Sequence, residues 1–184
     1  MDKALKIIAF AGMPFSGKSE AVKIANEKQI PVVRMGDMIW DEVKSCGLEL
    51  TDENVGKIAN DMRQTHGKDI WAKRTLEKIK SMKPPDILVI DGVRNIEEIG
   101  LFKKILGRDF LLVAVTVSDK IRYERAMNRG REDDSKDLSL IKERDKRELG
   151  WGLGRVIESA DVTISNDTGI EKFREDIKKI LEKI

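Results

Sequence analysis

Residues 12–19 read Gly12-Met13-Pro14-Phe15-Ser16-Gly17-Lys18-Ser19, directly after the apolar run Leu5 to Ala11. This stretch satisfies G-x-x-x-x-G-K-[ST], the spacing of a phosphate-binding loop between a strand and a helix. In such a loop the glycines let backbone N–H groups close around phosphate oxygens, the lysine reaches the β- and γ-phosphates, and the serine hydroxyl ligates Mg²⁺. The eight residues therefore predict a site for ATP and Mg²⁺, in which Lys18 and Ser19 have these two roles.

Further short apolar runs are typical of buried strands. They are Val32-Val33, Ile87 to Ile90, Leu111 to Val117 and Val162 to Ile164, and helical patterns fill the intervals between them. Apolar strands that alternate with helices indicate a parallel sheet covered on both faces, which binds ligands at the carboxyl ends of its strands. The predicted fold class is α/β, a three-layer α/β/α P-loop NTPase architecture with a five-stranded parallel sheet.

Two stretches interrupt this alternation. Residues from about 37 to 81 contain only helical patterns, which predicts a helical acceptor-binding insertion beside the sheet. Residues from about 122 to 147 are rich in arginine around an acidic run, which predicts a short lid. A chain of 184 residues suits one domain. We therefore expect a single domain, residues 1–184, that includes both stretches.

The composition excludes several kinds of site. Thirty-five basic and thirty-three acidic residues nearly cancel, so we expect no nucleic-acid partner and no attraction to an anionic membrane. One cysteine and one histidine rule out a Cys/His metal cluster and a histidine-based triad. No apolar run approaches the length of a membrane span and no signal-peptide pattern is present, so we expect a cytoplasmic protein.

A second set of chemical residues follows the third predicted strand. Asp91 ends that strand, which is where the acid that holds Mg²⁺ beside a phosphate loop is expected, usually acting through water. Ser19 and Asp91 are therefore the predicted metal ligands. Arg94 lies three residues later, where its forked guanidinium could bind the phosphate of an acceptor. The alternative for Arg94 is a surface arginine at the start of a helix.

The order of these segments resembles that of the nucleoside monophosphate kinases. Met35-Gly36-Asp37-Met38-Ile39 follows the second predicted strand, Asp91-Gly92-Val93-Arg94 follows the third, and the arginine-rich lid comes next. The chain thus looks like an adenylate-kinase-related protein. Residues 125–129 and 160–167 are also similar to dephospho-CoA kinase. The chain resembles, over essentially its whole length, an archaeal group of nucleotide kinase-like proteins related to both enzymes.

The resemblance implies roles for individual residues. Gly36 and Asp37 would line the acceptor site, and Arg94 would bind the acceptor phosphate. The lid arginines would close over the transferring group; they are Arg125, Arg129 and Arg131. Adenylate kinases carry an arginine where this chain has Trp40, and Arg63 in the insertion is a candidate substitute. The lid lacks cysteines, so no zinc-stabilised lid is expected.

The arginines of the lid also have a structural interpretation. Helices of mixed charge usually present a solvated face with pairs four residues apart, and Glu143 with Arg147 would form one. We therefore favour Arg125 and Arg129, which lie on one helical face, over Arg144 and Arg147 as residues that act on the phosphoryl group.

Phosphoryl transfer depends on positioning and on charge neutralisation, which suits Lys18, Mg²⁺ and the lid arginines. We expect an ATP-dependent phosphotransferase, a kinase that passes the γ-phosphate of ATP to a nucleotide-like acceptor, with AMP as the first choice. The alternative acceptor is a ribose hydroxyl of the dephospho-CoA kind, and the role of Asp37 distinguishes it from AMP. A carboxylate that accepts a proton from the ribose hydroxyl would favour the dephospho-CoA-like acceptor. Asp37 could instead cap a helix over residues 38–43. A regulatory ATPase without a small-molecule acceptor remains open, by analogy of fold alone.

Overall fold

The structure is a computed structural model, and it describes residues 5–83, 85–128 and 137–183. The sheet has five strands in the order β2-β3-β1-β4-β5, and its recorded pairings are all parallel. The strands are β1 (Lys6–Ala11), β2 (Val32–Arg34), β3 (Ile87–Asp91), β4 (Phe110–Thr116) and β5 (Val162–Ser165). The predicted α/β fold and the five predicted strands are confirmed, with boundaries that shift by one residue or so.

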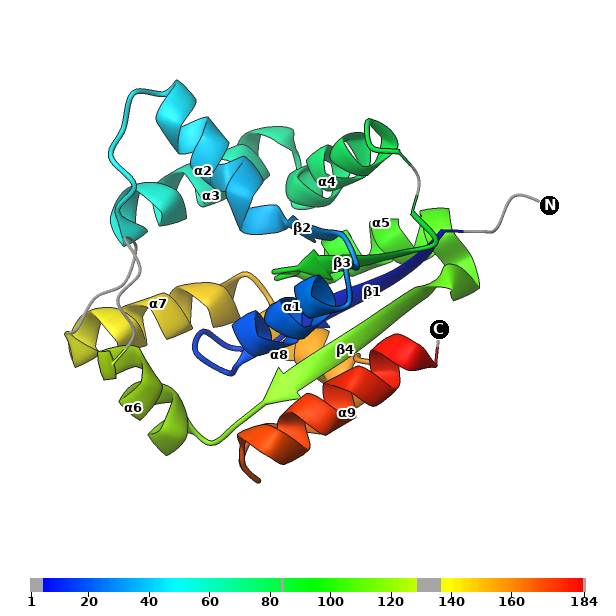
Figure 1. Ribbon diagram of the computed structural model, residues 1–184. Coiled ribbons are helices and arrows are strands. Elements are labelled where there is room, and N and C mark those ends of the chain that lie inside the picture. Colours follow the sequence, from blue (N-terminus) through cyan, green and yellow to red (C-terminus); the bar gives the residue numbers. More distant parts are fainter. Residues whose placement is uncertain (1–4, 84, 129–136, 184) are drawn as a thin grey trace.

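One face of the sheet is covered by α1 (Lys18–Glu27) and α9 (Ile170–Glu182), which lie side by side in Figure 1. Successive side chains of a strand point to opposite faces, and Ile8 and Phe10 of β1 point to this one. They pack with Ile24 of α1 and with Phe173 and Ile177 of α9. Burying an apolar side chain of this size contributes about 1.5–3 kcal/mol, so this layer anchors the helix that follows the predicted phosphate loop.

The opposite face is covered by α5 (Ile96–Leu106) and α8 (Leu153–Glu158), and the 3₁₀ turn Gly107–Asp109 follows α5. Ile7 and Ala9 of β1 point to this face. Phe102 stacks on Phe110 with the ring centroids 5.4 Å apart. Asn95 and Glu98 form a capping box at the start of α5, which fixes the turn that leaves β3. The sheet and the helices on its two faces therefore form the three layers that were predicted.

The segment between β2 and β3 is helical, as predicted, and consists of α2 (Met35–Ser45), α3 (Asp52–His66) and α4 (Ile70–Lys80). Trp71 of α4 is fully buried and donates from Nε1 to the carbonyl of Ala59 on α3, at 3.3 Å. Helix α2 begins at Met35, so Asp37 lies in its first turn. The suggestion that Asp37 caps a helix over residues 38–43 is therefore wrong, because the N-cap is Arg34.

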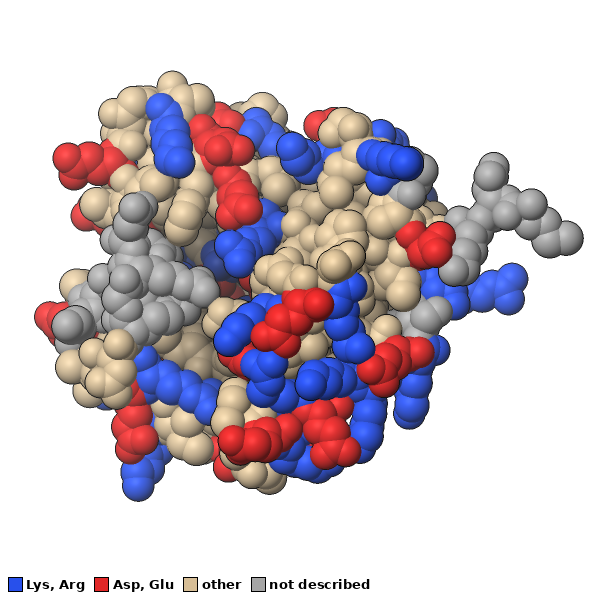
Figure 2. Space-filling model, in the orientation of Figure 1, with Lys and Arg blue, Asp and Glu red and all other residues tan. Residues whose placement is uncertain are grey.

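The predicted lid region contains α6 (Asp119–Asn128) and α7 (Leu138–Gly150). Arg129 and Arg131 lie between these helices and outside the described residues. Basic and acidic side chains are intermixed on the face drawn in Figure 2, as the nearly balanced composition requires. None of the described helices is both long and apolar enough to cross a bilayer.

Candidate functional site

The phosphate-loop motif forms the connection from β1 to α1 at the carboxyl end of β1. Gly12 and Gly17 have φ angles of 153° and 111°, which residues other than glycine rarely adopt. A Cβ atom at Gly12 would lie 2.4 Å from the carbonyl oxygen of Val115, and one at Gly17 would lie 2.1 Å from Nδ2 of Asn166. Glycine is therefore required at both positions, for close approach as well as for backbone angle.

Lys18 folds back over this loop. Its Nζ donates to the carbonyls of Gly12, at 2.6 Å, and Met13, at 3.0 Å. Burial lowers the pKa of Lys18 to about 8, and the nearby carboxylate of Asp91 opposes that shift. At neutral pH the ammonium is therefore mostly charged, and it is held where phosphate oxygens bound by the loop would meet it.

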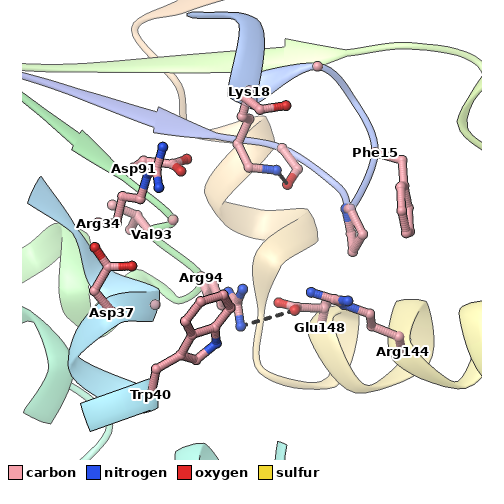
Figure 3. Close-up of a pocket in the computed structure, with 16 residues that line it drawn as sticks. Phe15, Lys18, Arg34, Asp37, Trp40, Asp91, Val93, Arg94, Arg144 and Glu148 are labelled. Carbon is pink, nitrogen blue, oxygen red and sulfur yellow. Dashed lines mark hydrogen bonds and ion pairs between the residues drawn. The ribbon is translucent and has the colours of Figure 1, made fainter. Parts of the chain in front are cut away.

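A pocket of about 140 Å³ opens beside the loop. Figure 3 shows that side chains enter it from separate elements: Asp37 and Trp40 from α2, Arg94 from the turn after β3, and Arg144 and Glu148 from α7. Gly36 and Arg34 also line it. Of the predicted acceptor residues, the fold thus brings Gly36, Asp37 and Arg94 together with Lys18.

Asp91 and Ser19 also line this pocket. Oδ1 of Asp91 is buried and has no hydrogen-bond partner among the described residues. Carboxylate and hydroxyl oxygens are the hard ligands that Mg²⁺ prefers, so an unsatisfied carboxylate oxygen beside the loop fits this ion. Within the described parts of the chain, no group of three or more His, Cys, Asp or Glu residues could hold a metal by itself. Mg²⁺ would therefore depend on Ser19, Asp91, phosphate oxygens and water.

Asp37 lines the pocket and keeps an exposed surface. Burial raises the pKa of Asp37; the guanidinium of Arg34 opposes that shift, and the carboxylates of Asp41 and Asp91 add to it. A carboxylate with a raised pKa is a stronger base than an ordinary aspartate. Asp37 is thus equipped to accept a proton from a hydroxyl group in the pocket.

Arg94 is engaged by groups of the protein itself. Its Nη1 lies 3.1 Å from Oε1 of Glu148, and its guanidinium lies 5.8 Å from the centroid of the Trp151 ring. Glu148 is only 2% exposed, and its Oε2 is buried without a hydrogen-bond partner among the described residues. The positive charge offered by Arg94 to the pocket is therefore already balanced.

Arg63 does not line this pocket. It is 6% exposed, pairs with Glu98 at 3.4 Å between Nη2 and Oε1, and lies 4.3 Å over the Trp151 ring. Burial raises the pKa of Glu98, and the charge of Arg63 opposes that shift. This placement gives no support to the predicted contact between Arg63 and an acceptor phosphate.

Helix α7 is tied to the insertion by charge. Asp52, at the start of α3, accepts from Nη2 of Arg147 with both oxygens, at 2.8 and 2.7 Å, and lies 3.4 Å from Nε of Arg144. A Cβ atom at Gly56 would lie 2.9 Å from Arg147, so the guanidinium packs directly on the backbone of α3. Arg147 therefore bonds to Asp52, where the sequence pattern suggested Glu143.

A second pocket, of about 570 Å³, lies on another side of the loop and shares Phe15, Gly17 and Ser19 with the first. Arg125 lines it and donates from Nη1 to the carbonyl of Ser16, at 3.2 Å, and from Nη2 to that of Asn166, at 3.3 Å. Arg125 thus stands at the second pocket, whereas Arg144, which the sequence did not favour, stands at the first.

Four residues that the sequence analysis did not propose as site residues line the first pocket: Arg34, Trp40, Arg144 and Glu148. Arg144 and Glu148 are four residues apart, hence on one helical face, and Trp151 follows three residues later. An aromatic residue that continues a charged helical face suggests that this face packs against the rest of the protein. The position of Trp151 could therefore have indicated that this face of α7 is not solvated.

The chain is similar to known proteins over most of its length. Residues 11–142 match the family model of an AAA domain. The chain is 42% identical to the UPF0200 protein of Methanosarcina barkeri over 96% of this chain and 95% of that one. It is 40% identical to the UPF0200 protein of Thermococcus onnurineus over 97% of each. A UPF0200/UPF0201 protein of Archaeoglobus fulgidus is 45% identical over 98% of this chain, which spans 56% of that longer relative.

Solved structures share the fold at low sequence identity. Protein TT1252 from Thermus thermophilus superposes with a TM-score of 0.63 at 17% identity, over 99% of each chain. Shikimate kinase from Acinetobacter baumannii, in complex with shikimate, superposes with a TM-score of 0.58 at 15% identity, over 98% of this chain and 93% of that one. The chain therefore shares its fold with these two structures, one of which is a shikimate kinase.

Proposed function

The chain belongs to the UPF0200 family of archaeal proteins and carries an AAA domain, and from this premise we propose that it is an ATP-dependent phosphotransferase with a small, nucleotide-like acceptor. The main support for this proposal is that two pockets share residues of one phosphate loop. A regulatory ATPase needs a nucleotide site alone. A second pocket, lined by ionisable side chains that face Lys18, supports the presence of an acceptor.

We assign the base and ribose of ATP to the larger pocket. Its volume of about 570 Å³ lies within the range of small-molecule sites. Because this pocket and the smaller one share Gly17 and Ser19, a nucleotide in the larger pocket can direct its phosphates along the loop toward Lys18. The acceptor would then approach from the side of Asp37 and Arg94.

The chemistry assigned to the chain follows from these positions. Lys18 neutralises charge on the β- and γ-phosphates, and the backbone N–H groups of the loop hold their oxygens. Mg²⁺ held by Ser19 and Asp91 would supply further neutralisation of the phosphates. Arg144 adds a guanidinium at the pocket. Arg129 and Arg131 lie outside the described residues, so their closure over the phosphoryl group stays a prediction.

The acceptor predicted first was AMP, whose nucleophile is a phosphate oxygen. Two arginines predicted to bind its phosphate are engaged by carboxylates, Arg94 by Glu148 and Arg63 by Glu98. The raised pKa of Asp37 suits a base for a hydroxyl group. The geometry therefore gives better support to the second candidate, a hydroxyl-bearing acceptor of the dephospho-CoA kind.

Replacement of Asp37 by asparagine is expected to lower kcat for a hydroxyl acceptor about 10²-fold, because the proton then has no carboxylate to accept it. Burial raises the pKa of Asp37, so the acidic limb of the wild-type kcat profile should lie above the range of an ordinary aspartate. That limb should be missing from Asp37→Asn. Asp61→Asn, an exposed change on α3 outside both pockets, is the control. An unchanged kcat in Asp37→Asn would remove Asp37 as the base.

The proposed function is tested by acceptor dependence. ATP turnover should rise strongly when the true acceptor is added, and AMP and dephospho-CoA are the first compounds to assay. Calorimetric titration of each, with Mg²⁺ and a non-hydrolysable ATP analogue present, separates binding from turnover. Slow hydrolysis that no nucleotide-like or hydroxyl-bearing acceptor stimulates would favour the regulatory ATPase instead.

A further inference from the structure

Glu148 has one carboxylate oxygen that is paired and one that is not. Oε1 lies 3.1 Å from Nη1 of Arg94. Oε2 is buried and has no hydrogen-bond partner in the described parts of the chain, although the side chain lines the pocket beside the loop. An unsatisfied buried acceptor costs the protein the full desolvation of that group. A hydrogen-bond donor that enters the pocket would satisfy it.

The pair also changes what Arg94 can bind. A phosphate monoester at Arg94 would either displace Glu148 or lie beside it. Displacement leaves a carboxylate that is 2% exposed without its partner, and breaking one side of a buried pair is strongly unfavourable. Lying beside Glu148 brings two anions together in a poorly solvated site. Either arrangement weakens the binding of a phosphate monoester.

Several cationic groups lie near Glu148. Arg144 lies one turn earlier on α7, Arg94 comes from the turn after β3, and Lys18 from the loop is close enough that both Arg94 and Glu148 influence its pKa. In Figure 3 a dashed line joins Glu148 to Arg94, and Arg144 lies beside them. The pocket is lined by four cations, Lys18, Arg34, Arg94 and Arg144, and by three carboxylates, Asp37, Asp91 and Glu148, so most of its positive charge is offset.

We propose that Glu148 determines the acceptor class: it accepts a hydrogen bond from a hydroxyl or ammonium group of the acceptor, and it disfavours acceptors that place a phosphate monoester at Arg94. The inference deepens the proposed function and rests on it, because it concerns the acceptor pocket of the same reaction. Glu148 is a specificity-determining residue in this account, and Asp37 remains the candidate base.

The test compares AMP with adenosine, which differ only in the phosphate monoester. Both are titrated calorimetrically into protein saturated with a non-hydrolysable ATP analogue and Mg²⁺. The Glu148→Gln variant keeps the shape of the side chain and removes its charge. It should bind AMP about tenfold more tightly than the wild type does, because Arg94 is freed for the phosphate. Its affinity for adenosine should not rise. Equal or weaker AMP binding by Glu148→Gln would overturn the proposal.

A second measurement needs no variant and so does not depend on how well Glu148→Gln folds. The wild-type protein with the ATP analogue bound should bind AMP no more tightly than adenosine. A preference for AMP of about tenfold or more in the wild type would contradict the proposal. Glu143→Gln, an exposed neutralisation on the same helix, is the control and should leave both affinities unchanged.

These results are separable from the proposed function. A protein that shows no acceptor-dependent turnover with any compound fails as a phosphotransferase, whatever its affinity for AMP. A protein that phosphorylates AMP readily, and binds it more weakly after Glu148→Gln, is still a phosphotransferase but contradicts the inference. Acceptor-dependent turnover and the phosphate preference are thus measured independently.

Discussion

Lys18→Ala is expected to lower phosphoryl transfer by about 10²- to 10³-fold, the loss seen when one donor to a transition-state anion is removed. The ammonium of Lys18 is held over the loop by the carbonyls of Gly12 and Met13. Among the described residues, no other lysine lines either pocket. Initial rates of acceptor phosphorylation with saturating ATP and Mg²⁺ measure the effect directly.

The fold should survive this change, because the side chain of Lys18 makes two hydrogen bonds to described residues, both with carbonyls of its own loop. Lys23→Ala, an exposed change on the same helix, is the matched control and should keep full activity. A Lys18→Ala variant that melts at the wild-type temperature and still transfers phosphate at an undiminished rate would refute the assignment of the loop as a catalytic site.

The second large effect concerns stability, at Arg122 of α6. Arg122 is 3% exposed and binds Asp145 of α7 through two nitrogens, at 3.0 and 2.7 Å. Nη1 also donates to the carbonyl of Pro14 in the phosphate loop, at 3.1 Å. Arg122→Ala leaves a buried carboxylate without its partner, so the free energy of unfolding should fall by about 3–5 kcal/mol. Denaturant titration followed by circular dichroism measures it.

Two variants sharpen this prediction. Arg108→Ala removes an exposed arginine and should change the free energy of unfolding by no more than about 0.5 kcal/mol. The double change Arg122→Met with Asp145→Leu replaces both charges by apolar groups of similar volume, so most of the lost stability should return. A loss below about 1 kcal/mol in Arg122→Ala would mean that solvent reaches Asp145 and that the pair is not buried in solution.

Much of the fold was predictable because its signals are local. The β1 strand, the loop and the start of α1 follow from a continuous apolar run, two glycines and a lysine, and none of these depends on distant residues. Asp91 was found in the same way, as a carboxylate that ends an apolar strand. The start of α2 was missed because Arg34 offers no capping side chain, so the helix begins at Met35 without a sequence signal.

The acceptor side of the site was harder to predict because tertiary packing creates it. Arg144 and Glu148 belong to α7, whose charge pattern is the one expected of a solvent-exposed helix. In the structure, however, both side chains line the pocket. Arg63 looked like a free cation in the insertion, but it is buried against Trp151 and Glu98. Which of many charged residues becomes buried depends on contacts between segments far apart in the sequence.

The attachment of α7 to α3 through Asp52 links two segments about ninety residues apart, and the Arg147 guanidinium rests on the backbone at Gly56. The contact with α3 therefore helps to hold Arg144 and Glu148 of α7 at the proposed acceptor pocket. In amide hydrogen exchange, α3 and α7 should open as one cooperative unit, at a lower free energy than the central strands. Protection of that unit should rise when an acceptor binds, because a ligand bound beside α7 stabilises the docked arrangement of α3 and α7.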